Sequence, residues 1–488
     1  MSLVQSVDNV ALLPAYLAAG TAVLVLLVDL LVARPRVTAA VAALGAAGTA
    51  VGAGLVGAAG TRRTFCVGDD CSWVWNGRAA LVAVVVALLT LGVLAISGPL
   101  LRAGRTPPGE YCFLLACAMT GGVVLGAAGD LITLIVALET LTLPLYVLVG
   151  LRRGSLAGAE AAVTFFVVSV VATTVTLLGA ALLYAVAGTL HLDRLGATLA
   201  ARDDLTALPL TTVAVALVVA GLAFKVAAVP FHAWAPATYD GAPLPVAAYL
   251  STASKLGGVV ALLAVVQRAL PGEVTGPVLA ALAVLTMTVG NLVALRQRRT
   301  VRLLAWSSVA QAGYILAPLG ALALAAGRTA DARAGAYAAA VAYTVFFVLL
   351  ELAAFAAVVA LRPADGDGGA LADLRGAARR HPWVGGAFAL ALIGLAGLPP
   401  GLAGLFAKVT VVRSLLAGHA GWLALVVAVN AVIGLAYYLR VTASLYGTPA
   451  GAATVRPART VALALGAATV AAVVIGFAPQ LVLDVAAR

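Results

Sequence analysis

The sequence predicts an all-α polytopic membrane protein with about fourteen transmembrane helices, arranged as two inverted repeats with breaks in helices 7 and 12. Of its 488 residues, 63% are hydrophobic and 10% are charged, and the mean hydropathy is +1.10. Soluble domains are nearer half apolar and a quarter charged. The apolar residues also gather into runs that reach the ~20 residues needed to span a bilayer. This composition excludes soluble enzymes and nucleic-acid-binding modules.

Polar, proline or glycine breaks separate the apolar runs, and each run is long enough for a helix. The first run ends at Val32, which is too long for a signal-peptide core, so we expect it to be retained as a helix. The fourteen runs are 11–32, 37–59, 79–101, 111–128, 131–151, 160–187, 209–232, 243–267, 277–295, 301–325, 335–361, 384–417, 421–446 and 460–482.

The connections are too short to hold a soluble domain. The longest, 60–78, 188–208 and 362–383, have about twenty residues each. We therefore expect one transmembrane domain over residues 1–488. Its expected parts are three N-terminal helices (1–105), a first repeat of helices 4–8 (106–268), a second repeat of helices 9–13 (269–446) and helix 14 (447–488).

The basic residues predict the orientation of the chain in the membrane. The net charge is +11, from 30 Lys and Arg against 19 Asp and Glu, and basic residues of polytopic proteins concentrate in cytoplasmic loops. If the first helix runs inward, sixteen Arg fall in the inner connections: 34, 36, 102, 105, 152, 153, 296, 298, 299, 302, 362, 375, 379, 380, 456 and 459. Nine fall outside, at 62, 63, 78, 194, 202, 268, 328, 333 and 488. This bias places both termini outside.

The four cysteines form two pairs with the same spacing. Cys66 and Cys71 fall in an expected outer loop, where a disulfide is permitted but not required. Cys112 and Cys117 lie within an apolar run. A buried thiol among Leu and Ala is more often packed than bound to zinc.

Lysine is confined to the apolar runs. The chain has 27 Arg but three Lys, at 225, 255 and 408, and none of the three is in a loop. Lysine can lose its proton when buried, whereas arginine stays protonated. The distribution indicates titratable cations placed inside the membrane.

Three of the charged residues lie near the middle of predicted helices. Lys255 has about a dozen helical residues on each side, Glu139 follows Asp130 by nine residues, and Glu351 is central in the eleventh run. An ionisable group at that depth costs several kcal/mol, at least ~2.5, and marks a functional site by default. The alternative is a static ion pair between Glu139 and one lysine that only pins two helices together.

Two lysine-bearing helices are also interrupted by proline. Pro230 follows Lys225 by five residues, and Pro399 and Pro400 precede Lys408 by nine and eight residues. Proline removes a helical hydrogen bond, and broken helices at corresponding places in two halves indicate an ion pathway. A kink needed for packing alone would explain one such helix more easily than two.

Further polar residues in the apolar runs are candidates for a proton relay. His232 has an unperturbed pKa near neutrality, although a histidine beside Trp234 is equally well explained as packing. Ser307, Ser308, Gln311 and Tyr314 could order water between the charged sites or join helices by hydrogen bonds. They share the tenth run.

Motifs for energy-yielding chemistry are absent from the sequence. It contains no P-loop, no G-x-G-x-x-G after a strand and no haem or iron–sulfur cysteine pattern. We therefore expect no cofactor or metal in this chain, and the energy for transport must come from another protein.

Three segments carry a family resemblance. LIVALETLTLPLYVLVG (134–150), PFHAWAPATYDGAPLPVAAYLSTASKLGG (230–258) and DLRGAARRHPWVGGAFALALIGLAGLPPGLAGLFAK (373–408) resemble the N-type antiporter-like membrane subunits of the proton-pumping respiratory NADH:quinone oxidoreductase, complex I. The similarity covers essentially the whole chain. The TYDGAPLPV and TASK segments are closer to N-type than to L- or M-type subunits.

The resemblance implies a role for each central residue. Glu139 would be the fifth-helix carboxylate paired with Lys225 of the broken seventh helix, Lys255 the connecting lysine, and Lys408 the lysine at the outward half-channel. Moving Glu139 away from Lys225 would push a proton towards Lys255 and Lys408. Glu351 departs from the family pattern, in which a neutral polar residue is expected there.

The resemblance also implies partners and a location. FMN, iron–sulfur clusters and quinone would belong to other subunits, and this chain would join M-, K- and J-type neighbours in a hetero-oligomer in the lipid of a bacterial plasma membrane, without binding nucleic acid. Its function would be proton translocation coupled to quinone reduction elsewhere. The alternatives are a subunit of a multisubunit Na+/H+ antiporter and a structural membrane anchor.

Overall fold

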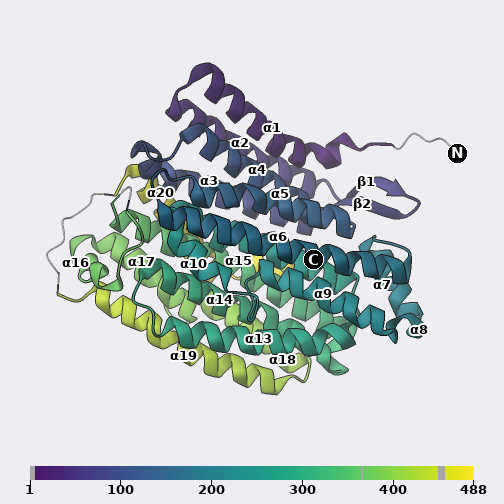
Figure 1. Cartoon of the computed structure of the whole chain (residues 1–488). Coiled ribbons are helices and arrows are strands. Elements are labelled where there is room, and N and C mark those ends of the chain that lie inside the picture. Colours follow the sequence, from purple (N-terminus) through teal and green to yellow (C-terminus); the bar gives the residue numbers. More distant parts are fainter. Residues whose placement is uncertain (1–5, 364–365, 449–456, 488) are drawn as a thin grey trace.

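The computed structural model describes residues 6–363, 366–448 and 457–487, which form a bundle of roughly parallel helices (Figure 1). The α-helices of the first half are α1 (Asn9–Val32), α2 (Pro35–Ala58), α3 (Gly77–Arg102), α4 (Pro108–Gly126), α5 (Leu131–Gly150), α6 (Leu156–Ala187), α7 (Leu192–Ala201), α8 (Asp203–Thr206), α9 (Pro209–Lys225), α10 (Trp234–Gly241), α11 (Leu244–Tyr249) and α12 (Lys255–Arg268). Those of the second half are α13 (Gly272–Ala294), α14 (Thr300–Gly320), α15 (Ala330–Leu361), α16 (Ala377–Arg380), α17 (Pro382–Ala396), α18 (Leu402–Ala417), α19 (Gly421–Leu445), α20 (Arg459–Phe477) and α21 (Gln480–Ala487).

Short irregular helices and one hairpin complete the fold. They are the π-helix η1 (Leu250–Ser254), the 3₁₀ turns η2 (Ala321–Ala323), η3 (Ala326–Arg328) and η4 (Leu371–Leu374), and the strands β1 (Arg62–Val67) and β2 (Asp70–Trp75).

Each of the fourteen predicted apolar runs contains helix, so the polytopic helical fold is confirmed. Among the described residues, eleven helices are long and apolar enough to cross a membrane, with α11, η1 and α12 counted as one span. The twelfth run is divided into α17 and α18, and the seventh contains α9 and the break that follows it, with helix resuming just beyond the run in α10. The tenth is the 21-residue α14, whose polar residues Ser307, Ser308 and Gln311 reduce its hydropathy.

The order of elements repeats along the chain. A helix of 32 residues, α6 or α15, is followed by a divided helix and then by a span of 25 residues, α11–α12 or α19. Both divided helices have prolines at the break, Pro230 in one and Pro399–Pro400 in the other. The breaks therefore lie at the corresponding step of each half, as the sequence predicts.

A β-hairpin at residues 62–75 is a feature that the sequence analysis does not predict. Its antiparallel register places Cys66 opposite Cys71, and the two form a disulfide. Gly68 occupies the turn with φ +64°, a conformation that suits glycine. Trp73 and Trp75 on β2 stack and are buried against the helices. The spacing of Cys66 and Cys71 left it open whether they are bonded, and in the hairpin they form a disulfide.

The two ends of the bundle differ in what covers them (Figure 1). The end that carries β1, β2, α7 and α8 is called the hairpin face, and the end that carries α16 is called the opposite face. Arg379 and Arg380, two of the Arg residues predicted to be inside, belong to α16 on the opposite face. Arg456, predicted inside, and Arg488, predicted outside, lie outside the described residues.

Arg299 fastens a connection on the opposite face. Its guanidinium donates to both carboxylate oxygens of Asp240, at 3.0 and 2.8 Å, and to Asp367 at 2.8 Å. A backbone hydrogen bond also joins the segment before α14 to the segment before α17: the amide of Leu371 donates to the carbonyl of Arg298 at 2.8 Å. Arg299 thereby links α10, the helix after the break in the seventh helix, to the connection before α17.

Replacing Arg299 with glutamine should release this connection. We expect hydrogen exchange at the Leu371 amide to accelerate about fivefold, since exposed ion pairs contribute ~1 kcal/mol at most. The exposed Arg302→Gln in the first turn of α14, the helix that follows Arg299, is the control and should exchange at the wild-type rate. The hydrogen bond from Arg299 lowers the pKa of Asp367, so the link is present at neutral pH and is lost on acidification below pH ~4. Unchanged exchange in Arg299→Gln would contradict this role.

Candidate functional site

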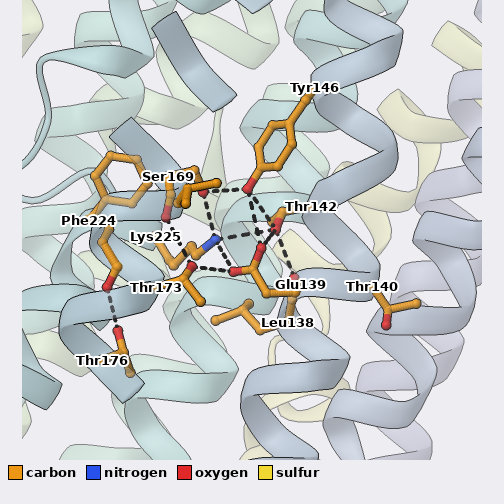
Figure 2. A network of polar contacts seen from close by, with 12 residues as sticks. Leu138, Glu139, Thr140, Thr142, Tyr146, Ser169, Thr173, Thr176, Phe224 and Lys225 are labelled. Atoms are coloured by element: carbon orange, nitrogen blue, oxygen red, sulfur yellow. Dashed lines mark hydrogen bonds and ion pairs between the residues drawn. The ribbon is translucent and has the colours of Figure 1, made fainter. Parts of the chain in front are cut away.

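The predicted pair Glu139 and Lys225 is formed in the interior of the bundle (Figure 2). The Nζ atom of Lys225 lies 2.6 Å from Oε1 of Glu139, and their side chains are 6% and 19% exposed. Glu139 comes from α5 and Lys225 from the last position of α9. A charged pair this deep in a membrane-spanning bundle costs desolvation and persists only with further hydrogen bonds.

Hydroxyl groups from α5 and α6 supply those hydrogen bonds (Figure 2). Thr173 donates to Glu139 at 2.6 Å, and Lys225 donates to Ser169 at 2.9 Å and to Thr142 at 3.3 Å. Tyr146 donates to Ser169 at 2.5 Å and lies 3.4 Å from Glu139. The carboxylate and the ammonium thus share a network that can hold either of them when the other moves.

The break in the seventh helix places Lys225 at a helix end. After Lys225 the chain leaves the helix, with Ala227 at φ +58° before Pro230, and helix resumes at Trp234. The freed backbone groups are satisfied from outside the helix, because the Trp234 indole donates to the carbonyl of Phe224 and the Val229 amide donates to Thr286, both at 3.0 Å. A lysine at such a point can change its position without disrupting a continuous helix.

Lys255 lies at the junction between the π-helix η1 and α12. Its side chain is almost fully buried, and Nζ donates to the backbone carbonyl of Ser308 on α14 at 2.7 Å. The π-helix changes the phase of the helix at this point, as π-helical segments often do at functional sites. Lys255 is thereby aimed at α14, away from Glu139 on α5.

Glu351 is fully buried on α15, and neither of its carboxylate oxygens has a hydrogen-bond partner in the described part of the chain. It interacts electrostatically with Lys255. Among the residues that the structure describes, the hydroxyls of Tyr239 and Ser308 are also buried there without a partner in good geometry. A buried carboxyl group without a hydrogen-bond partner requires an explanation. The electrostatic attraction between Glu351 and Lys255 is one.

Beyond Lys255 a chain of polar side chains continues through α14. Ser307 lies 2.5 Å from the hydroxyl of Tyr438, and the Gln311 amide donates to Tyr438 at 3.0 Å and to the carbonyl of Leu395 at 3.1 Å. Tyr343 donates to the Gln311 carbonyl oxygen at 2.5 Å. Ser307 and Gln311 therefore join α14 to α15, α17 and α19.

This series of polar side chains ends at Lys408. The lysine lies on α18, just after the break in the twelfth helix, and donates to the carbonyls of Leu395, at 3.3 Å, and Ala396. Those carbonyls are at the end of α17 and are free because the helix stops there. The ammonium also lies over the ring of Tyr314, 5.1 Å from its centre. Leu395 thus accepts from both Gln311 and Lys408.

Tyr314 leads on to an amide cluster that the sequence analysis missed. Asn291 donates to the Tyr314 hydroxyl at 3.1 Å and to Asn430 at 3.2 and 3.3 Å, and it accepts from Tyr437 at 3.1 Å. All four residues are buried. An asparagine in the middle of an apolar run was the signal that could have found Asn291 and Asn430.

The predicted residue His232 takes no part in the polar contacts described above. Its ring packs against Trp306 at 5.1 Å between centres, and its Nδ1 is buried without a hydrogen-bond partner among the described residues. It lies between α9 and α10, and no described hydrogen bond of its side chain connects it to a lysine. The contact with Trp306 agrees with the packing interpretation, and the relay role of His232 stays a prediction.

Most of the predicted site residues thus fall into three clusters of polar contacts, which follow one another across the bundle and are called the series below. Glu139 and Lys225 form one cluster, Lys255 with Glu351 a second, and Ser307, Gln311, Tyr314 and Lys408 a third. All members come from the interior faces of their helices, and the series passes from one broken helix to the other. Side chains with this chemistry can accept and donate protons across the bundle.

The chain is similar to membrane subunits of respiratory enzymes. Residues 128–434 match the transmembrane family described as NADH:quinone oxidoreductase/Mrp antiporter. The sequence is 78% identical to NADH-quinone oxidoreductase subunit N of Salinispora tropica, with all of both chains covered. It is 45% identical to subunit N 2 of Streptomyces griseus over 92% of this chain and 85% of that one.

Solved structures give the same result for the fold. A chain of respiratory complex I from Thermus thermophilus is 30% identical, covers 97% of this chain and 99% of its own length, and superposes with a TM-score of 0.80. A chain of the Mrp complex from Dietzia sp. is 23% identical with a TM-score of 0.81, over 97% of this chain and 96% of that one, which shows the shared fold alone. With its buried Glu139–Lys225 pair and its full-length identity to the Salinispora protein, the chain belongs to the subunit N family of NADH:quinone oxidoreductase, in the antiporter-like group of complex I membrane subunits.

Proposed function

We propose that this chain moves protons through Glu139, Lys225, Lys255, Glu351 and Lys408. The observation that carries the proposal is the 2.6 Å contact between Glu139 and Lys225 inside the bundle, within a network of hydroxyl groups. A pair that can separate changes how strongly the lysine holds its proton, because a nearby carboxylate favours the ammonium and burial disfavours it.

The proposed movement starts at the paired state. When Glu139 withdraws, the ammonium of Lys225 is left in an apolar interior with hydroxyl partners, so release of its proton towards Lys255 is favoured. Lys255 passes the proton to Lys408 past Ser307, Gln311 and Tyr438, whose contacts lie between the two lysines. The titrations are coupled, so protonation belongs to the series and not to one residue.

The proposal assigns the driving force to other subunits. A switch needs a free-energy difference between two states, and this chain's sequence carries no redox-centre motif. FMN, iron–sulfur clusters and quinone are therefore placed in partner subunits, with M-, K- and J-type chains as neighbours. The chain then acts as one component of a proton translocase in a bacterial plasma membrane, and the hairpin face, with both termini, is extracytoplasmic.

Na+/H+ antiport is the second candidate function. The chain has the fold of the Mrp complex chain, but the full-length relative at 78% identity is a quinone oxidoreductase subunit, which favours proton transfer driven by quinone reduction. Replacing Na+ by K+ in the assay medium separates the two. NADH-driven acidification should be unchanged without Na+, and a strict Na+ requirement would contradict the proposal.

Replacing Glu351, which lies near the middle of the proposed proton path, tests whether protons pass through it. Glu351→Gln keeps the shape of the side chain and removes the proton that it can exchange, so NADH-driven proton pumping and quinone reduction should fall together by about tenfold or more. The assay is acidification of inverted membrane vesicles beside NADH oxidation. Assembly should be retained, because glutamine keeps the volume of the side chain and Lys255 keeps its hydrogen bond to the carbonyl of Ser308; native gels check it.

The control for this substitution is Glu160→Gln on the exposed surface of α6. It removes one carboxylate from a membrane-spanning helix without touching the interior and should leave both activities unchanged. Wild-type pumping in Glu351→Gln would show that Glu351 is not part of the proton path.

A further inference from the structure

A deep cavity opens on the hairpin face, apart from the polar series. It has a volume of about 680 Å³ and lies between α3, α4, α12 and α15, within the ~300–1,000 Å³ typical of ligand pockets. Its inner walls are mostly apolar, with Val82 and Val85 from α3, Val260 and Leu263 from α12, and Val341 and Val345 from α15; Tyr337 and Thr344 on α15 also line it.

The depth of the cavity matches one leaflet of a bilayer. Leu256 lies twelve residues before Arg268 on α12, and Val345 lies twelve residues after Arg333 on α15. At ~1.5 Å per helical residue, both walls reach ~18 Å below the mouth. Half of a hydrocarbon core of ~30 Å is ~15 Å, so an acyl chain can lie along the walls for most of its length.

The mouth of the cavity is positively charged. Four arginines line it, Arg63, Arg78, Arg268 and Arg333, with one acid, Asp193. Arg268 and Asp193 form an ion pair at 2.8 Å, and that hydrogen bond lowers the pKa of Asp193, so the two charges cancel at neutral pH. The other three have no carboxylate within ion-pair distance in the described ranges, and Arg78 donates only to the neutral amide of Gln267, at 2.9 Å.

We propose that this cavity binds a membrane lipid with an anionic phosphate headgroup. One acyl chain lies between α12 and α15, and the phosphate lies among Arg63, Arg78 and Arg333, at the level where the helices end. Arginine suits this ligand because its planar guanidinium binds phosphate oxygens in pairs. A neutral lipid would fill the walls equally well but would leave Arg78 and Arg333 uncompensated and Arg63 with only its longer-range attraction to Asp193.

The proposal is tested on the intact complex with a photoreactive lipid. The purified, delipidated complex is incubated with phosphatidylglycerol that carries a diazirine in its acyl chain, irradiated and mapped by mass spectrometry. We expect labelled peptides from α3, α12 and α15 around Val85, Val260 and Val345. Unlabelled phosphatidylglycerol should compete, whereas phosphatidylcholine and inorganic phosphate should not.

Two kinds of variant make the result specific. The triple change Arg63→Gln, Arg78→Gln and Arg333→Gln should reduce labelling about tenfold or more, since each arginine near an anionic headgroup contributes measurably to binding. The separate change Val345→Trp, which fills the cavity and keeps the charges, should also reduce it.

The matched control removes three arginines from the same face outside the cavity. Arg194→Gln, Arg202→Gln and Arg328→Gln together should leave labelling unchanged. Equal labelling in the two triple variants, or equal competition by phosphatidylcholine, would overturn the anionic-lipid proposal. Competition by inorganic phosphate would show a small-anion site instead, and absence of label from the cavity walls would show that another occupant fills it.

Discussion

Replacing Lys225 with alanine is expected to abolish NADH-driven proton pumping and to reduce NADH:quinone turnover by about 10²-fold or more, the range for loss of a positioned proton-transfer group. The change removes the cation that lies 2.6 Å from Glu139 and leaves that carboxylate with hydroxyl partners only. Both activities are measured in membranes, and native gels check that the complex is assembled.

Lys225→Arg separates a proton relay from a static ion pair. Arginine keeps the positive charge beside Glu139 but does not release a proton in a protein. Activity should therefore be lost in this variant as well, although the ion pair can form. Arg413→Ala, an exposed basic residue on α18, is the control and should be active. Full activity in Lys225→Arg would show that the pair only joins two helices.

Gly397→Ala is expected to displace Lys408 and to reduce turnover by about tenfold. Gly397 ends α17 with φ +81°, and a Cβ atom there would lie 2.6 Å from Cδ and 3.1 Å from Nζ of Lys408. A non-glycine residue in this conformation costs about 1–2 kcal/mol before the clash is counted. The lysine would have to leave the carbonyls at the end of α17.

Gly386→Ala is the matched control on the same helix, because a Cβ atom there meets nothing within 4 Å. NADH:quinone turnover and thermal inactivation of the assembled complex are measured for both variants. Gly386→Ala should be as active and as stable as the wild type. Equal activity of the two variants would mean that Lys408 does not need its position at the helix break.

The membrane helices and their charged residues were predictable because the bilayer imposes strong rules. Only long apolar runs can cross it, so a central Glu139 or Lys255 stands out against its neighbours. The proline positions also predicted the two breaks. That Lys225 meets Glu139, 86 residues earlier, came from the family resemblance, since spacing along a chain does not fix which helices pack together.

The remainder of the site depends on packing that no local pattern records. Tyr438 and Tyr343 read as ordinary aromatic residues of apolar helices, yet their hydroxyls converge on Gln311. The hairpin at 62–75 was overlooked because two short strands resemble a polar connection in a helical protein. His232 had the right chemistry for a relay, but its ring is turned towards Trp306.

Lys255 connects the two halves of the proposed path, so its removal tests proton movement through this chain most directly. The measurement is the rate of proton pumping and the rate of NADH oxidation by the purified complex in proteoliposomes, with wild type and Lys255→Met side by side. We expect pumping and NADH oxidation both to collapse in Lys255→Met while the complex remains assembled, because quinone reduction is coupled to proton movement. Unchanged pumping and turnover in Lys255→Met would contradict a proton path through this chain.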